Sequence, residues 1–158
     1  MFNPDSSLLS HHFAQIAETL AKEPENTQAW TDASQSLGAG RASEPELAGV
    51  LDRREAPAFL RMVEEWKSGK RMLPEQDRQL LHRAIKAFKK RLKVTRLDAE
   101  SGIGGGAMSS GKQSGIVGIT PPANFGREVW DELVRQGRLS GGHHGIYELR
   151  PEPPTAPR

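Results

Sequence analysis

Cysteine is absent from the 158 residues of this sequence. Its absence excludes disulfide bonds, thiolate metal sites and a cysteine nucleophile. The sequence also lacks any apolar run long enough to cross a membrane as a helix. The N-terminal segment MFNPDSSLLSHHFAQ has neither the basic region nor the apolar core of a secretory signal. We therefore expect a soluble, cytoplasmic protein with no membrane partner.

Aromatic residues are scarce, at 6% of the chain with a single tyrosine. The three tryptophans fall in apolar patterns that predict burial, so few aromatic faces remain for stacking on unpaired bases. This scarcity argues against recognition of single-stranded nucleic acid. The length is that of one domain, with or without a small appendage, and we expect an ordered core with loose ends.

Acidic and basic residues are unevenly placed, although the net charge is only +2. Residues 1–56 carry nine acids and four bases, whereas residues 57–97 carry twelve bases and four acids. Three consequences stay open at this point. The basic part docks on the acidic part of its own chain, two copies associate, or the basic part binds a foreign anionic partner.

The clearest predicted helix runs from Pro74 to Leu97. A proline suits the first turn of a helix, and the acids that follow it suit the helix dipole. Apolar residues then recur with the helical period along one stripe. That stripe consists of Leu81, Ile85, Phe88 and Leu92. The pattern predicts a long helix with one face in the core.

The same helix carries no acid between Gln79 and Leu97 and seven cations. These are Arg83, Lys86, Lys89, Lys90, Arg91, Lys93 and Arg96. A helix face that meets only solvent usually mixes both signs, because Glu–Lys pairs four residues apart stabilise it. Two interpretations remain: a solvated surface, or a docking surface for phosphates or an acidic partner.

Four more short helices are predicted before this one. They cover residues 5–22 with Asp5 or Ser6 as the cap, residues 27–37 capped by Thr27, a segment capped by Ser43, and residues 57–69. Together the five helices indicate a helical bundle over residues 1–97.

The sequence changes character after residue 92. Residues 93–97, KVTRL, fit a strand or a continuation of the helix, and residues 98–115 form a Gly/Ser-rich segment that we expect to be flexible. Residues 115–120, GIVGIT, predict a strand that pairs with 93–97 as a hairpin. A helix over 126–136 and a hairpin of 138–140 with 146–149 follow, before a disordered tail at 150–158. The predicted fold class is α+β, mainly α: the bundle, then a small hairpin–helix–hairpin part at 116–149 packed on it.

Catalytic and metal motifs are incomplete. Residues 106–112 match the spacing GxxxxGK of a phosphate-binding loop, but Gln113 stands where magnesium needs a hydroxyl, and a strand follows where a helix should begin. The adjacent pairs His11–His12 and His143–His144 do not have the spacing of a helical metal site. We therefore expect no enzymatic activity, no cofactor and no metal.

The segment REVWDELVRQGRLSGGHHGIYELR, residues 127–150, places a helix, a strand, a glycine turn and a strand in succession. It resembles the last helix and wing of winged-helix domains. The resemblance implies that Arg127 and Arg135 contact DNA from the helix. It implies the same for Arg138, His143 and His144 in or near the wing.

The function expected from the sequence is that of a non-catalytic intracellular interaction protein, a scaffold or adaptor, with a protein partner or a second copy of itself. The alternative is a nucleic-acid-binding or regulatory protein that uses the basic helix 79–97 and the winged-helix-like segment. In both cases the candidate binding residues are Arg83, Lys86, Lys90, Lys93, Arg96, Arg127, Arg135 and Arg138.

Overall fold

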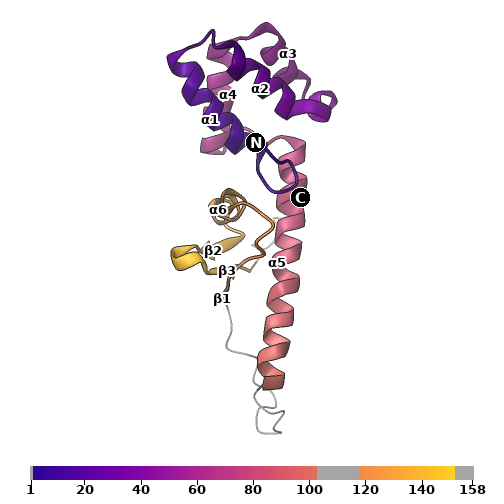
Figure 1. Cartoon of the computed structure of the whole chain (residues 1–158). Helices are drawn as coiled ribbons and strands as arrows, with labels where there is room; N and C mark the ends of the chain where they lie inside the picture. The colour runs from indigo at the N-terminus through magenta and orange to yellow at the C-terminus, as the bar shows by residue number, and fades with distance from the viewer. Residues whose placement is uncertain (1, 103–117, 152–158) are drawn as a thin grey trace, which may run out of the picture. The chain divides into compact units, whose positions relative to one another are not determined.

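The computed structural model describes residues 2–102 and 118–151. It divides the chain into two compact units, 1–81 and 82–158, which meet inside a long helix (Figure 1). Among the described residues the chain is mainly helical with one small antiparallel sheet, so the predicted α+β, mainly α class is confirmed. The sequence-based ranges 1–97 and 116–149 stay a prediction about folding units.

Before α5 begins at Glu75, the described residues of the first unit form four α-helices and one 3₁₀ turn (Figure 1). They are α1 (Leu9–Lys22), α2 (Thr27–Leu37), η1 (Gly38–Ala42), α3 (Pro45–Arg53) and α4 (Ala56–Ser68). The four α-helices were predicted, but the N-terminal caps predicted for α1, α2 and α3 were wrong. Asn26, not Thr27, caps α2 by accepting the Ala29 N–H at 2.9 Å. The N-cap of α3 is Glu44, which makes no side-chain cap, rather than Ser43.

Helix α1 begins at Leu9, later than predicted, and neither Asp5 nor Ser6 caps it. Its cap comes from Asp77, in the first turn of α5, the long helix described below. One carboxylate oxygen accepts the Leu9 N–H at 2.7 Å, and the other accepts the Ser10 N–H at 2.9 Å. Asp77 is the single buried charged residue in the described part of the chain.

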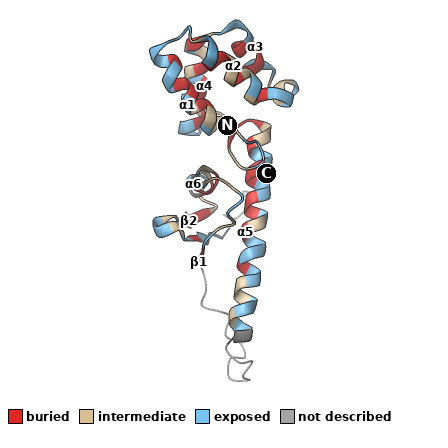
Figure 2. Cartoon of the chain, viewed as in Figure 1, coloured by how far each residue is buried: buried red, intermediate tan, exposed pale blue. Residues whose placement is uncertain are grey.

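The core of the first unit is aromatic at its centre. Phe59 packs against Phe13 and Trp30, with ring centroids 5.4 and 5.7 Å apart, and Trp66 lies 6.1 Å from Phe13. All four rings are buried, as are several leucines of α1, α2 and α3, and Figure 2 shows buried residues along these helices. Burial of this size stabilises each large side chain by about 1.5–3 kcal/mol.

Helix α5 (Glu75–Gly102) is longer than predicted. It runs through residues 93–97, which are therefore helical rather than the first strand of a hairpin, and it includes residues 98–102 of the predicted loop. The reason is helical propensity. Residues 75–101 are rich in Lys, Arg, Leu and Ala, and no glycine or proline interrupts them before residue 102. The remainder of the predicted loop and the tail after residue 151 lie outside the described residues.

The second unit adds a sheet and one helix to the later part of α5 (Figure 1). Its elements are β1 (Gly118–Ile119), α6 (Arg127–Arg135), β2 (Leu139–Gly141), the turn η3 (His143–Gly145) and β3 (Tyr147–Leu149). The strand order is β1-β3-β2, with both pairs antiparallel. The predicted hairpin of β2 with β3 is confirmed. The partner predicted for β1 was wrong, because β1 pairs with β3 through Ile119 opposite Tyr147.

The core of the second unit forms where α6 meets α5. The ring of Trp130 lies 5.9 Å from Phe88 and 6.4 Å from Tyr147, measured between centroids. Val129, Leu133 and Leu139 of the same unit are fully buried. The sequence stripe on the long helix therefore faces a core, as predicted.

Candidate interaction surface

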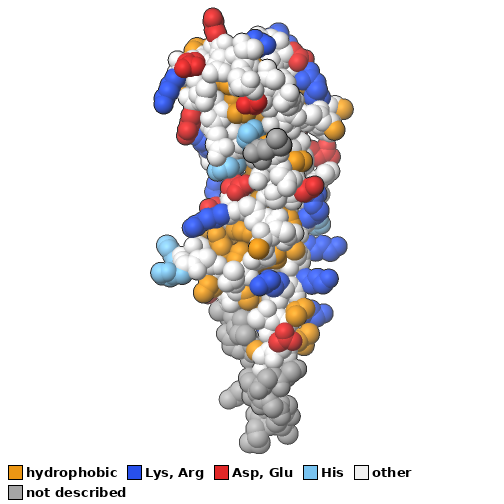
Figure 3. Space-filling model, viewed as in Figure 1, with side chains coloured by type: hydrophobic (Ala, Val, Ile, Leu, Met, Phe, Trp, Pro, Cys, Tyr) orange, Lys and Arg blue, Asp and Glu red, His pale blue; other side chains and the backbone are white. Residues whose placement is uncertain are grey.

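The cations of α5 are exposed on the side opposite its buried stripe. Arg83, Lys86, Lys90 and Lys93 are all exposed, whereas Ala84, Ile85, Phe88 and Leu92 of the same helix are buried. Because residues three or four apart lie on the same side of a helix, the four cations form one row. We call this row the α5 basic face. Figure 3 shows Lys and Arg side chains projecting from α5 in such a row.

The α5 basic face is not neutralised by carboxylates. Ion pairs occur elsewhere in the described residues, but none involves Arg83, Lys86, Lys90 or Lys93. Four cations within eleven residues therefore raise the local positive potential, which attracts anions. Arg96, predicted together with these four, is half-buried and has an interaction of its own, so we leave it out of the face.

The cations on α6 differ from those on α5 because they are paired with acids of the same helix. Arg135 donates to Glu132 from Nε at 2.7 Å, and this hydrogen bond raises the pKa of Arg135. Arg127 lies 3.7 Å from Asp131. Arg138 is half-buried in the chain between α6 and β2. A surface of mixed sign attracts phosphates weakly. The charge on α6 therefore favours the DNA contacts implied by the winged-helix resemblance less than the charge on the α5 basic face favours an anion.

The glycine turn next to α6 exposes both of its histidines, His143 and His144. His144 has φ +61°, a left-handed conformation that is uncommon outside glycine. In the preceding strand, Gly141 has φ +99°, and a Cβ there would lie 2.7 Å from the carbonyl oxygen of Ile146. The tight turn thus depends on glycine. It also brings Tyr147 back beneath α6, where its hydroxyl donates to Asp131 at 3.1 Å.

Sequence analysis missed the role of Tyr147. Its side chain is buried, and this burial together with the hydrogen bond to Asp131 raises the pKa of the phenol. The signal available in the sequence was that the single tyrosine stands in an alternating segment, YEL, after a glycine turn. That pattern places its ring on one face of a strand, but it does not identify the acid that it meets.

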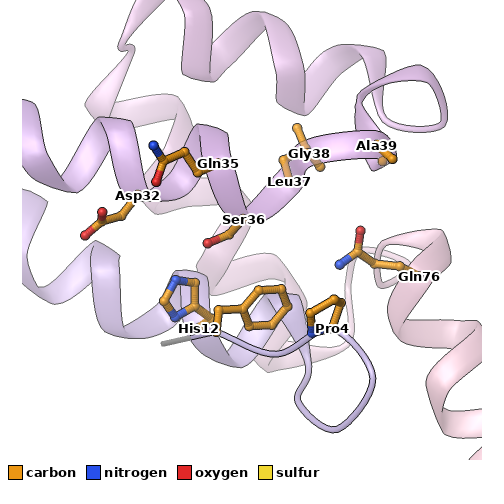
Figure 4. Close-up of a pocket in the computed structure, with 11 residues that line it drawn as sticks. Pro4, His12, Asp32, Gln35, Ser36, Leu37, Gly38, Ala39 and Gln76 are labelled. Carbon is orange, nitrogen blue, oxygen red and sulfur yellow. The ribbon is translucent and has the colours of Figure 1, made fainter.

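A separate cavity of about 830 Å³ lies within the first unit. Figure 4 shows His12 and Pro4 on one side of it, Asp32, Gln35 and Ser36 of α2 on the other, and Gln76 at one end. The ring of Phe2 stacks on His12 with centroids 5.0 Å apart. Burial lowers the pKa of His12, and the charge of Asp32 opposes that shift.

The cavity could not be identified from the sequence, because four separate segments of the chain supply its walls. Across residues 2–102 and 118–151, no group of three or more histidines, acids or cysteines is placed to hold a metal ion. The loop motif at 106–112 lies outside these residues. Likewise, none of the helices in the described part of the chain is long and apolar enough to span a bilayer.

Comparison with known proteins found no matching family model, no matching curated protein and no matching solved structure.

Proposed function

We propose that this protein is a non-catalytic interaction protein that binds an acidic partner protein through the α5 basic face. The observation that carries the proposal is the contrast between charged surfaces of the second unit. On α5, four exposed cations make no ion pair with any residue that the structure describes, whereas on α6 the arginines Arg127 and Arg135 are paired.

The α5 basic face lowers the stability of helix α5 in the unbound protein. Like charges at i and i+4, as in Lys86 and Lys90, destabilise a helix by a few tenths of a kcal/mol. A bound anion removes that repulsion and gains attraction to each cation. A row of this kind therefore favours the complex over the free chain and accelerates encounter with an acidic surface.

The test is fluorescence anisotropy with labelled polyglutamate, duplex DNA and single-stranded RNA at about 50 and about 200 mM salt, a range over which contacts to a polyanion lose most of their affinity. We expect polyglutamate to bind at the lower salt and to be released at the higher. The double substitution Lys86→Glu with Lys90→Glu abolishes this binding. A matched reversal, Lys67→Glu with Lys70→Glu, changes two exposed lysines of the first unit and leaves it intact.

Nucleic acid is the alternative that the same measurement decides. Tighter binding of duplex DNA than of polyglutamate, lost in the α5 variant, would assign the face to phosphates instead. Absence of binding to all three polyanions at the lower salt would contradict the proposal.

A further inference from the structure

The α5 basic face continues into an apolar end. Leu97 lies four residues beyond Lys93 and is 52% exposed, and Val94 beside it is 49% exposed. In the described part of the chain, the other exposed large hydrophobic residues are Met72 and Ile146. We define the α5 seam as Arg83, Lys86, Lys90, Lys93, Val94 and Leu97.

The spacing of the seam is regular. From Arg83 to Leu97 the steps are three, four, three and four residues, the repeat that keeps side chains on one side of a helix over several turns. At about 1.5 Å per residue the seam is about 21 Å long. A line of that length matches one side of a second helix, whose anchoring residues recur at the same intervals.

The chemistry of the seam changes along its length, and this points to a protein. Phosphates of nucleic acid would pair with the cations but would gain nothing from covering Val94 and Leu97. A partner helix that ends in apolar side chains removes both residues from water, at about 25 cal/mol per Å² of apolar surface covered. A membrane surface fits less well, because interfacial helices present a broad apolar side rather than two residues.

A second copy of this chain is a poor occupant. Two α5 seams laid together would set cations against cations. The acids of the first unit are partly engaged within it: Arg41 pairs with Asp52, Arg53 with Glu55, and Arg71 with both Glu46 and Glu65.

We infer that the α5 seam docks an acidic amphipathic helix of a partner protein, with carboxylates against the four cations and apolar residues against Val94 and Leu97. The inference rests on the proposed function and adds the secondary structure and residue pattern of the partner.

The experiment uses the full chain and labelled synthetic peptides of about three heptads, a length at which a helix begins to be stable. The seam peptide carries Glu at positions that share one side of its helix, followed by Leu on the same side. It is made with the Leu end at either terminus, since docking is parallel or antiparallel. The dispersed peptide has the same composition with Glu spread over all sides. We expect the seam peptide in one orientation to bind about tenfold more tightly than the dispersed peptide, a difference of about 1.4 kcal/mol.

A second variant separates this inference from the proposed function. Val94→Ser with Leu97→Ser weakens binding of the seam peptide several-fold and leaves binding of polyglutamate unchanged. Circular dichroism confirms that the variant folds. Lys86→Glu with Lys90→Glu abolishes binding of both probes.

Equal binding of the seam and dispersed peptides would overturn the inference while the proposed function stands. Tighter binding to duplex DNA, or to vesicles of anionic phospholipid, than to the seam peptide would overturn the inference and would count against the proposed function as well, because it would assign the face to phosphates. Binding of no polyanion and no peptide would overturn both.

Discussion

At the scale of single residues, the structure depends on side chains that cap or bridge elements far apart in sequence. Asp77 accepts two backbone N–H groups at the start of α1 from a position 68 residues beyond Leu9. Local sequence pointed instead to Asp5 or Ser6, because rules for helix caps consider only neighbours. A carboxylate supplied by another helix leaves no local pattern to recognise.

Replacing Asp77 with alanine should lower the free energy of unfolding by about 1–3 kcal/mol, because buried N–H groups would lose their acceptor. Urea denaturation followed by circular dichroism measures the change. The control is Asp52→Ala, which removes an exposed pair with Arg41 and should cost less than about 1 kcal/mol. Equal effects of the two substitutions would show that Asp77 does not fix the start of α1.

Tyr147 should ionise at higher pH in the folded protein than in the unfolded chain, because burial and the Asp131 carboxylate both raise its pKa above the ordinary value of 10.0. The folded state then retains the proton that the unfolded state has lost. The resulting stability is complete below about pH 10 and declines as pH rises through the folded-state pKa. Since the chain has one tyrosine, the ultraviolet absorbance of tyrosinate reports this residue alone.

Tyr147→Phe should therefore reduce the dependence of the free energy of unfolding on pH above about pH 10. At neutral pH it should cost about 0.5–1.5 kcal/mol through loss of the hydrogen bond to Asp131. Denaturation at several alkaline pH values, compared with the unmodified protein, tests both effects. Parallel curves for the two proteins would mean that Tyr147 is not the group responsible.

At the scale of elements, helices were predictable and strand pairing was not. The periods of α1 to α6 are readable because a helix repeats its apolar positions within its own sequence. The strands contain only two or three residues each, so alternation carries little information about their partners. We predicted that β1 pairs with residues 93–97, the nearest segment with an extended pattern. Those residues have enough helical propensity to continue α5 instead.

The contact between α5 and α6 should dominate the stability of the second unit. Phe88→Ala removes a fully buried ring that packs 5.9 Å from Trp130, and we expect a loss of about 3–5 kcal/mol. The matched control is Val94→Ala on the exposed side of the same helix, which should change stability by less than about 0.5 kcal/mol. Urea denaturation compares the two variants. A small effect at Phe88 would contradict the assignment of this ring to the core.

Substitutions on the exposed side of α5 should hardly change the free energy of unfolding. Lys86→Glu with Lys90→Glu should alter the free energy of unfolding by no more than about 0.5 kcal/mol, because both side chains are exposed and unpaired. Thermal denaturation of the variant and the unmodified protein measures this change in stability. A large fall in the melting temperature would mean that this face packs against protein in solution, and the binding experiments would then need other variants.

At the scale of the whole molecule, the boundary between the two units also separates net negative from net positive charge. Residues 1–81 carry thirteen acids and nine bases, whereas residues 82–158 carry seven acids and thirteen bases. The exposed positions of the α5 cations followed from helical period alone. The burial of Tyr147 against α6 and the cavity at His12 did not, because each joins residues from different elements.

This division of charge gives a prediction about self-association. Two chains that met through opposite charges would bring the first unit of one copy to the α5 seam of another. Several acids of the first unit are already paired with arginines, so we expect no such association. Sedimentation velocity at about 50 mM salt, where the Debye length exceeds 10 Å, should give a sedimentation coefficient independent of protein concentration. Association that the Lys86→Glu, Lys90→Glu variant abolishes, and the Lys67→Glu, Lys70→Glu variant does not, would instead identify a second copy as the occupant of the seam.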